Sequence, residues 1–265
     1  MAWWQGLHAG KTLQFFPRKF DRYVEPFLGS GAVALHLAHV PSVLADTNHN
    51  LIQFYLSVKD TPVQLTACLK QFAAEYNNAD SQKEYYINAR KSYNEGVYLG
   101  PQKAAAFLFL NKTCFNGIWR VNSSGAFNVP FGQRIPCPAL VISEENFNQI
   151  SEYLNTKNVE VINNDFRLIL EDVVSAGDLV YCDPPYVDTK FTSYTAGKFT
   201  ENDHEDLIDL LHKADRNGCK VVVSSSSTTE RFQGFKQHIT ERSTSVSGYK
   251  SARGKSPEYV YTLGF

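Results

Sequence analysis

The sequence predicts an α/β protein, built on a mostly parallel sheet with helices on both faces and interrupted by a mostly helical insertion. Short apolar segments suited to buried strands alternate with helical patterns near both ends of the chain. A glycine-containing turn joins the first strand to its helix, and the alternation stops across the middle of the chain. The 265 residues suit one large core domain that carries an insertion.

The first alternation occupies the opening part of the chain. A strand is expected at residues 22–27, and it runs into the turn 28–31 and a helix at 32–39. Residues 42–46 predict a second buried strand, and residues 48–59 predict another helix. Strand, turn, helix and strand in this order are the start of a parallel sheet.

The middle of the chain has a different pattern. Residues 62–94 and 101–112 predict helices with no strand between them, and a further helix is expected at 143–154. Residues 114–134 form a polar loop with aromatic and glycine residues. These patterns divide the chain into a core domain, residues 1–54 and 159–265, and an insertion, residues 55–158.

The alternation resumes after the insertion, with strands expected at 159–162, 178–182 and 220–223. Between the last two strands, Thr200 and Asp203 form a capping box at the start of an amphipathic helix, which Gly218 can end. A helix between two apolar strands suits a right-handed parallel connection. His204 is expected on the polar face of this helix.

Composition excludes several classes of protein. With 43% hydrophobic residues the chain is too apolar for intrinsic disorder, and its longest apolar run, Ala104–Leu110, is far shorter than the roughly 20 residues of a membrane span. Residues 1–19 lack the pattern of a signal peptide, so we expect a cytoplasmic protein. A monomer is the default expectation for its oligomeric state. The five cysteines form no C-x-x-C pair and the histidines no metal-like set, which predicts neither disulfides nor a metal site.

Charge is unevenly distributed along a nearly neutral chain of 26 basic and 27 acidic residues. Residues 96–143 contain four basic residues and no acid, and residues 242–257 repeat this pattern. Residues 144–178 contain eight acids and two bases. Such segregation can give the protein one basic face for a polyanion, although solvated loops that lack acids remain an equal alternative.

The sharpest motif is Asp183-Pro184-Pro185-Tyr186, directly after a predicted buried strand. In an open parallel sheet, ligands bind beyond the carboxyl ends of the strands. The two prolines fix the backbone and remove two donors, which leaves an acceptor-rich edge beside the tyrosine ring. Such an edge suits a planar ring that stacks on Tyr186 while its amino group donates two hydrogen bonds. An ordinary Asp-Pro turn is the alternative that this motif alone leaves open.

A second motif combines Gly29 and Gly31, after the first strand, with Asp46 at the end of the second. Glycines here let a ligand approach the backbone, and an acid at the next strand tip can accept from ribose hydroxyls. Ala34 stands where a dinucleotide fingerprint has its third glycine, so an adenosyl ligand without phosphates fits as well. A tight turn without any ligand is the alternative for an isolated G-x-G.

These motifs together resemble the Dam-type (D12 class, alpha group) N6-adenine-specific DNA methyltransferases over nearly the whole chain. The similar segments are Glu25–Gly31, Leu44–Asn48 followed by Leu51 and Ile52, Asn164–Phe166, Asp183–Tyr186, Phe191–Tyr194 with Lys198–Thr200, Asn111–Gly132 and Ser247–Glu258. The resemblance implies a Rossmann-like class I methyltransferase sheet and an inserted DNA target-recognition domain with a β-hairpin loop. It also implies transfer of a methyl group from S-adenosylmethionine to N6 of an adenine flipped out of double-stranded DNA, in a GATC-like site.

The resemblance assigns roles to individual residues. The implied catalytic residues are Asp183, Pro184, Pro185 and Tyr186. The implied cofactor contacts are Lys11, Phe27, Gly29, Gly31, Asp46, Asp165, Phe166 and Asp183. The implied DNA contacts are Phe115, Asn116, Ile118, Arg120, Asn122, Pro130, Arg134, Lys250, Arg253 and Lys255. Among these, Phe115 is expected to wedge into the base stack and Arg120 to read a guanine.

The opening segment departs from the family pattern. Only Gly10 and Lys11 align with it, and Leu7 stands where a tryptophan is expected. A lysine that would contact DNA in the family is also missing, which predicts weaker readout of the outer base pair.

Three other functions stay open at this point. A methyltransferase for another amine, such as cytosine N4 or a protein glutamine, usually has Ser or Asn where Asp183 stands. A nicotinamide dehydrogenase is supported only by the glycine turn and Asp46. A DNA-binding relative without catalysis is compatible with the divergent opening segment. For the loop at 114–134 alone, the alternative to DNA reading is a loop that packs its aromatic residues onto the core.

Overall fold

The computed structural model describes residues 9–37, 40–132, 144–156, 158–185, 199–225, 231–244 and 254–265. Its helices are α1 (Ala9–Leu13), α2 (Ala32–His36), α3 (His49–Asp60), α4 (Pro62–Asn78), α5 (Gln82–Asn94), α6 (Gly100–Thr113), η1 (Phe115–Gly117), α7 (Glu144–Leu154), α8 (Phe166–Leu168), η3 (Ile169–Val173) and α9 (Glu201–Arg216). Its strands are β1 (Tyr23–Glu25), β2 (Ser42–Asp46), β3 (Val159–Asn163), β4 (Leu179–Cys182), β5 (Lys220–Ser225), β6 (Lys236–Thr244) and β7 (Gly254–Leu263).

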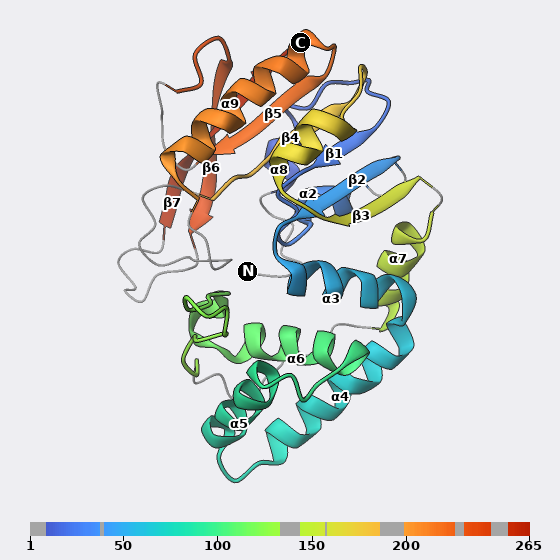
Figure 1. Cartoon of the computed structure of the whole chain (residues 1–265), viewed down its shortest axis with the longest axis vertical. Coiled ribbons are helices and arrows are strands. Elements are labelled where there is room, and N and C mark those ends of the chain that lie inside the picture. The colour runs from blue at the N-terminus through green and yellow to red at the C-terminus, as the bar shows by residue number, and fades with distance from the viewer. Residues whose placement is uncertain are drawn as a thin grey trace. The chain divides into compact units, whose positions relative to one another are not determined.

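The described residues form two compact units (Figure 1). The core unit comprises the described residues from 9 to 47, from 158 to 185 and from 199 to 265. The inserted unit comprises residues 48–132 and 144–156.

The core unit is built on a seven-stranded sheet in the order β3-β2-β1-β4-β5-β7-β6. The first five strands in this order pair in parallel, whereas β7 pairs antiparallel with both β5 and β6. The parallel strands therefore place their carboxyl ends along one edge, where ligands bind in folds of this kind. The predicted α/β class is confirmed.

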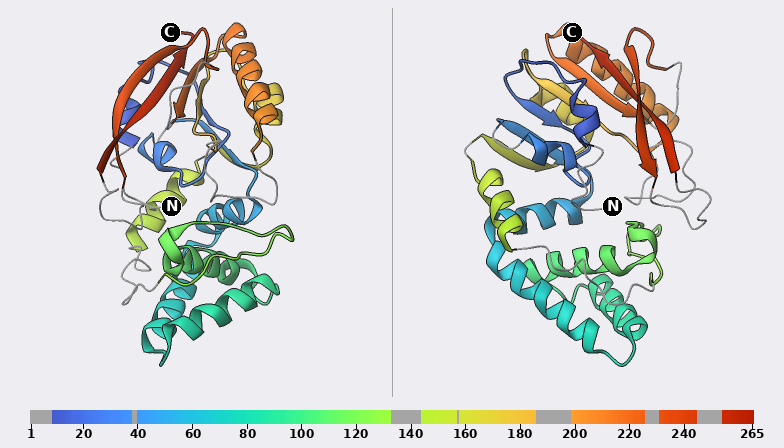
Figure 2. Two further views of the ribbon diagram at one scale, coloured as in Figure 1. Left: turned by 90° about the vertical axis from the view of Figure 1, so that its left-hand side faces the viewer. Right: turned by 180° about the vertical axis from the view of Figure 1, so that it is seen from behind.

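Helices cover both faces of this sheet (Figures 1 and 2). One face packs apolar strand residues such as Val24, Val180 and Val223 against α8, η3 and α9. On the other face, the Phe16 ring lies 5.6 Å from that of Tyr181 and 6.3 Å from that of Tyr23. Because β1, β4 and most of β5 are buried on both sides, they appear in the sequence as continuous apolar runs.

The antiparallel β6–β7 pair was not predicted from the sequence. Residues 242–257 were interpreted as a basic segment. In the structure β7 begins at Gly254, and its pairing with β6 extends to that residue, which lies opposite Thr244. β7 shows no strict alternation, because its inner part is inserted between β5 and β6 and is buried on both sides.

The inserted unit is helical, with α6 at its centre. Residues Ala104–Leu110 of α6 are all at most 4% exposed, and the helix is packed against α3, α4 and α5. The predicted helix at 62–94 is two helices. Ala79 takes an extended conformation that ends α4, and the Ser81 hydroxyl accepts from the Glu84 amide to begin α5.

Within the described ranges, none of the helices is both long and apolar enough to pass through a membrane. The same residues hold no cluster of three or more His, Cys, Asp or Glu side chains arranged for a metal ion.

Candidate active site and DNA-reading loop

The turn after β1 is held by the end of β2. Gly29 and Gly31 have φ angles of 48° and 64°, in the left-handed region that only glycine adopts without strain. The Gly29 amide donates to Asp46 Oδ2 at 3.0 Å, and the Leu28 amide donates to the carbonyl of Ala45 at 2.8 Å. Asp46 therefore fixes the backbone of the turn, in addition to any contact with a ligand.

Three carboxylates come from neighbouring strands at this edge. Asp46 ends β2, Glu25 ends β1, and Asp183 directly follows β4. Glu25 is only 3% exposed, and its Oε2 has no hydrogen-bond partner among the described residues. Burial raises the pKa of Glu25 well above its ordinary value, and the negative charges of Asp183 and Asp46 raise it further. The fold therefore favours the protonated form of Glu25, although hydrogen bonds from Tyr23 and the Ala34 backbone partly offset this effect.

Aromatic rings gather close to the same edge. Phe27, after β1, stacks on Phe166 with 5.2 Å between ring centroids, and Phe199 meets Phe27 edge-on at 5.8 Å. Phe166 is 2% exposed, and the guanidinium of Arg167 lies 4.6 Å from its ring centroid. This aromatic cluster gives the site an apolar wall next to its carboxylates.

Arg167 connects the segment after β3 with the start of α9. Its guanidinium contacts the carboxylates of Asp165, Asp203 and Asp206, the last two at 2.5 and 2.6 Å. These ion pairs raise the pKa of Arg167. Asp165 also caps α8 by accepting from the Arg167 amide at 3.0 Å. The side chain of Asp165 is therefore engaged in local structure.

The Asp-Pro-Pro turn leaves β4 at the centre of the sheet. Asp183 is exposed, Pro184 is buried and Pro185 is half-buried. Cys182, the last residue of β4, is fully buried, and burial raises the pKa of its thiol. Cys182 therefore stays protonated and belongs to the core, as expected for a buried cysteine.

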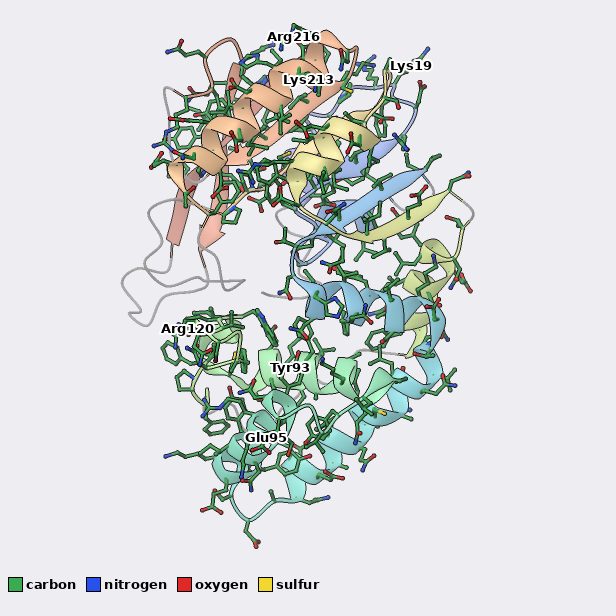
Figure 3. All side chains as sticks on the ribbon, viewed as in Figure 1. Lys19, Tyr93, Glu95, Arg120, Lys213 and Arg216 are labelled. Carbon is green, nitrogen blue, oxygen red and sulfur yellow. The ribbon has the colours of Figure 1, made fainter. Side chains whose placement is uncertain are left out.

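The inserted unit carries the loop that was predicted to read DNA. Antiparallel bridges join Cys114 to Phe131 and Val121 to Phe127. A Cβ at Gly132 would lie 2.3 Å from the Cys114 carbonyl oxygen, so the two ends of the loop can meet only at a glycine. Figure 3 shows Arg120 on this loop, which follows α6.

The predicted DNA contacts on this loop differ in exposure. Phe115 is 48% exposed, which is unusual for a phenylalanine, and its neighbour Asn116 has a left-handed φ of 56°. Ile118 and Arg120 are half-buried, and Pro130 is exposed. The Asn122 side-chain oxygen accepts hydrogen bonds from Ser124 and Ala126, so it shapes the tip of the loop.

Comparison with known proteins identifies the family. The model of the family described as D12 class N6 adenine-specific DNA methyltransferase matches residues 12–247. The chain belongs to this family. It is therefore a DNA adenine methyltransferase with a Rossmann-like sheet, and family membership decides against the dehydrogenase and against methylation of another amine.

Three relatives match this DNA adenine methyltransferase over most of the length of both chains. The chain is 35% identical over 256 residues to the type II methyltransferase M1.LlaDCHI of Lactococcus lactis subsp. cremoris, covering 93% of the chain and 87% of the relative. It is 34% identical to the type II methyltransferase M.MjaIII of Methanocaldococcus jannaschii, with 88% and 85% covered. It is 32% identical to a DNA adenine methylase of Vibrio cholerae, with 89% and 85% covered.

Several predicted site residues of the methyltransferase lie together, and others lie outside the described residues. Phe27, Gly29, Asp46 and Phe166 belong to the core unit beside Asp183, and Lys11 lies half-buried on the short helix α1. Lys255 lies on β7, where only its backbone is described. The predicted residues outside the described ranges are Tyr186, Arg134, Lys250 and Arg253.

His204 packs beside the Asp-Pro-Pro turn, a position that the sequence analysis missed. It was expected on a polar face, but it is 9% exposed and meets the Phe199 ring edge-on at 4.7 Å. Its ring is hydrogen-bonded to the backbone of Pro185, which offers only a carbonyl, so the histidine is the donor. Burial lowers the pKa of His204, with a further contribution from Arg231. The sequence did offer a signal for this contact. Phe199 precedes the N-cap Thr200 and His204 is the fourth residue of the helix, and residues at these two positions often pack together.

Proposed function

We propose that this DNA adenine methyltransferase moves a methyl group from S-adenosylmethionine to N6 of an adenine flipped out of duplex DNA, within a GATC-like site. The observation that supports this most is the shared edge of the sheet. The acceptor-rich turn at Asp183 follows β4, and the glycine turn fixed by Asp46 follows the adjacent strand β1. A methyl acceptor and a methyl donor bound at these two turns would be neighbours.

The residues at this edge suit S-adenosylmethionine, which supplies an activated methyl group on a positively charged sulfur. The carboxylates of Asp46 and Asp183 favour a cationic ligand, and the buried Glu25 Oε2 is a polar atom that lacks a partner among the described residues. Phe27 and Phe166 offer apolar surface for an adenine. The open space around Gly29, where a Cβ would meet only the Phe27 carbonyl at 3.9 Å, lets a ligand approach the backbone.

The Asp-Pro-Pro turn holds the target amine in this proposal. The Asp183 carboxylate and the Pro184 carbonyl accept the two N6 hydrogens of adenine, which turns the nitrogen lone pair toward the methyl group. The same acceptors stabilise the positive charge that develops on N6 during transfer. The ring of Tyr186 stacks on the base. The remaining rate enhancement comes from holding the reacting atoms in line.

The loop of the inserted unit finds the target. An adenine inside a duplex cannot reach a bound cofactor, so it must leave the stack at a cost of a few kcal/mol. The exposed ring of Phe115 can replace lost stacking by entering the duplex, as apolar wedges do. Arg120 reads a guanine through paired hydrogen bonds to its O6 and N7.

Incubation of the protein with labelled S-adenosylmethionine and plasmid DNA tests the proposal, followed by mapping of the methylated adenines. We expect methylation at a short palindrome that contains GATC. Asp183→Ala should abolish turnover and leave DNA binding within about twofold, because Asp183 acts on the amine and not on the duplex. Retained turnover in Asp183→Ala would reject this role. Calorimetry of S-adenosylmethionine binding to the variant shows whether turnover is lost because the cofactor no longer binds or because the methyl transfer itself fails.

A further inference from the structure

The return segment of the DNA-reading loop, residues 127–129, is gripped by one face of α5. The Asn94 side chain exchanges two hydrogen bonds with the backbone of Phe127, at 2.9 and 3.0 Å. The Tyr86 hydroxyl and Arg90 Nη1 both donate to the carbonyl of Val129, at 2.7 and 2.9 Å. Tyr86, Arg90 and Asn94 are spaced four residues apart and therefore share a face of the helix.

Residue 128 stands between these two fixed neighbours. Phe127 and Val129 are 2% and 3% exposed, and Phe127 stacks on the buried Trp119 at 4.4 Å. In an extended segment alternate side chains point to opposite sides, so Asn128 is turned away from the core. Because its neighbours on both sides are hydrogen-bonded to a helix, the place of Asn128 is set by rigid structure.

Asn128 contacts Arg120 across the loop in three ways. Its amide donates to the Arg120 carbonyl at 3.1 Å. Its side-chain Oδ1 accepts from Arg120 Nε at 2.8 Å, and its carbonyl accepts a longer bond from Arg120 Nη2 at 3.4 Å. An arginine side chain carries five N–H groups, and Asn128 accepts from two of them. The three that remain, two on Nη1 and one on Nη2, have no partner among the described residues.

We propose that Asn128 is a positioning residue for base recognition, which rests on the proposed role of Arg120 as the guanine reader. Asn128 occupies the edge of the guanidinium formed by Nε and one hydrogen of Nη2. Arg120 therefore presents its other edge, formed by Nη1 and the second hydrogen of Nη2, to the base. It also orders a long side chain before DNA binds, so that less conformational entropy is lost on recognition. Asn128 thereby sets how strictly the guanine is selected, and α5 holds Asn128 in place.

The test compares kcat/KM on duplexes that carry guanine or another base at the position read by Arg120. Asn128→Ala should reduce this discrimination about tenfold, since one well-formed bidentate contact contributes about 1–3 kcal/mol. Asn128→Asp keeps an oxygen for Arg120 Nε, so it should retain most of the discrimination while its negative charge raises the KM for every duplex. Asn78→Ala, at an exposed asparagine at the end of α4, is the matched control and should change neither quantity.

A double substitution separates failure of this inference from failure of the proposed function. If Arg120→Ala leaves base discrimination unchanged, Arg120 does not read the base and the proposed role of Arg120 is wrong. If Arg120→Ala lowers discrimination but Asn128→Ala does not, the positioning role of Asn128 is wrong. The proposal requires that Asn128→Ala lowers discrimination in the parent protein and adds no further loss in Arg120→Ala. Thermal unfolding of each variant excludes a general loss of structure.

Discussion

At the scale of single residues, Glu25 has an environment that opposes its charge. The carboxyl is 3% exposed and lies close to Asp46 and Asp183, so the folded protein keeps it protonated when the unfolded chain would release the proton. The folded state binds this proton more tightly. Stability from Glu25 is therefore complete below its ordinary pKa of 4.5 and is lost as pH rises above that value toward the folded pKa.

Glu25→Gln should remove this loss, because glutamine has a similar shape and never ionises. We expect the variant to gain stability relative to the parent as pH rises above 4.5, by about 1.4 kcal/mol for each unit by which the pKa is raised. Urea unfolding of both proteins at several pH values measures the difference. A difference that does not change with pH would show that Glu25 ionises normally in the folded state.

Single residues also show how much of the site the sequence reveals. Gly29, Asp46 and Asp183 could be predicted, because each directly follows a recognisable strand and strand ends lie at a known edge. Glu25 also stands at a strand end, but its pKa is raised because it is buried on β1 between β2 and β4, near the carboxylates of Asp46 and Asp183. The positions of His204 and Asn128 depend on contacts with Phe199 and Arg120, and no local pattern specifies those contacts.

At the scale of elements, the start of α9 is closed by a reciprocal capping box. The Thr200 hydroxyl accepts from the Asp203 amide at 3.3 Å, and the Asp203 carboxylate accepts from the Thr200 amide in return. Although burial raises the pKa of Asp203, hydrogen bonds from Arg167 and Thr200 lower it overall. The predicted capping box is confirmed, and it is coupled to Arg167 as well.

Thr200→Ala should lower the free energy of unfolding by about 1 kcal/mol, the usual cost of losing such a cap. Asp203→Ala should cost more, because it removes the ion pair with Arg167 as well as half of the box. Thr200→Ser keeps the hydroxyl and is the matched control. Urea unfolding gives all three values, and equal losses for serine and alanine would contradict a role for the hydroxyl.

The elements differ in how well they could be predicted. The strands β1, β2, β4 and β5 were found because burial on both faces makes them continuously apolar. β6 and β7 were missed because charged and polar residues interrupt their apolar positions and Pro257 lies within β7. The break between α4 and α5 depends on the extended conformation of Ala79, and alanine carries no signal for it.

At the scale of the whole molecule, a nearly neutral protein must bind a polyanion through local charge. The inserted unit has no acid between Gly96 and Gly132, where it carries Lys103, Lys112 and Arg120. Neutralising phosphates with lysines such as Lys103 and Lys112 releases counterions, so binding weakens as salt rises.

DNA affinity should therefore fall by about tenfold or more between about 50 and 200 mM salt. Arg120→Ala should weaken binding to the target site without changing this salt dependence, because a base contact releases few counterions. Fluorescence anisotropy with target and unrelated duplexes measures both effects. A clear reduction of the salt dependence in Arg120→Ala would place Arg120 on a phosphate.

The route of the chain between β2 and β3 has an evolutionary consequence. These strands are neighbours in the sheet, with Asp46 paired to Asn163, yet all described residues of the inserted unit lie between them in the sequence. A parallel pair always requires a connection, and here that connection is a compact helical unit. Recombination at the two borders of the inserted unit would exchange this unit between relatives as a cassette. Sequence preference could then change in a single step while the reaction chemistry is inherited intact.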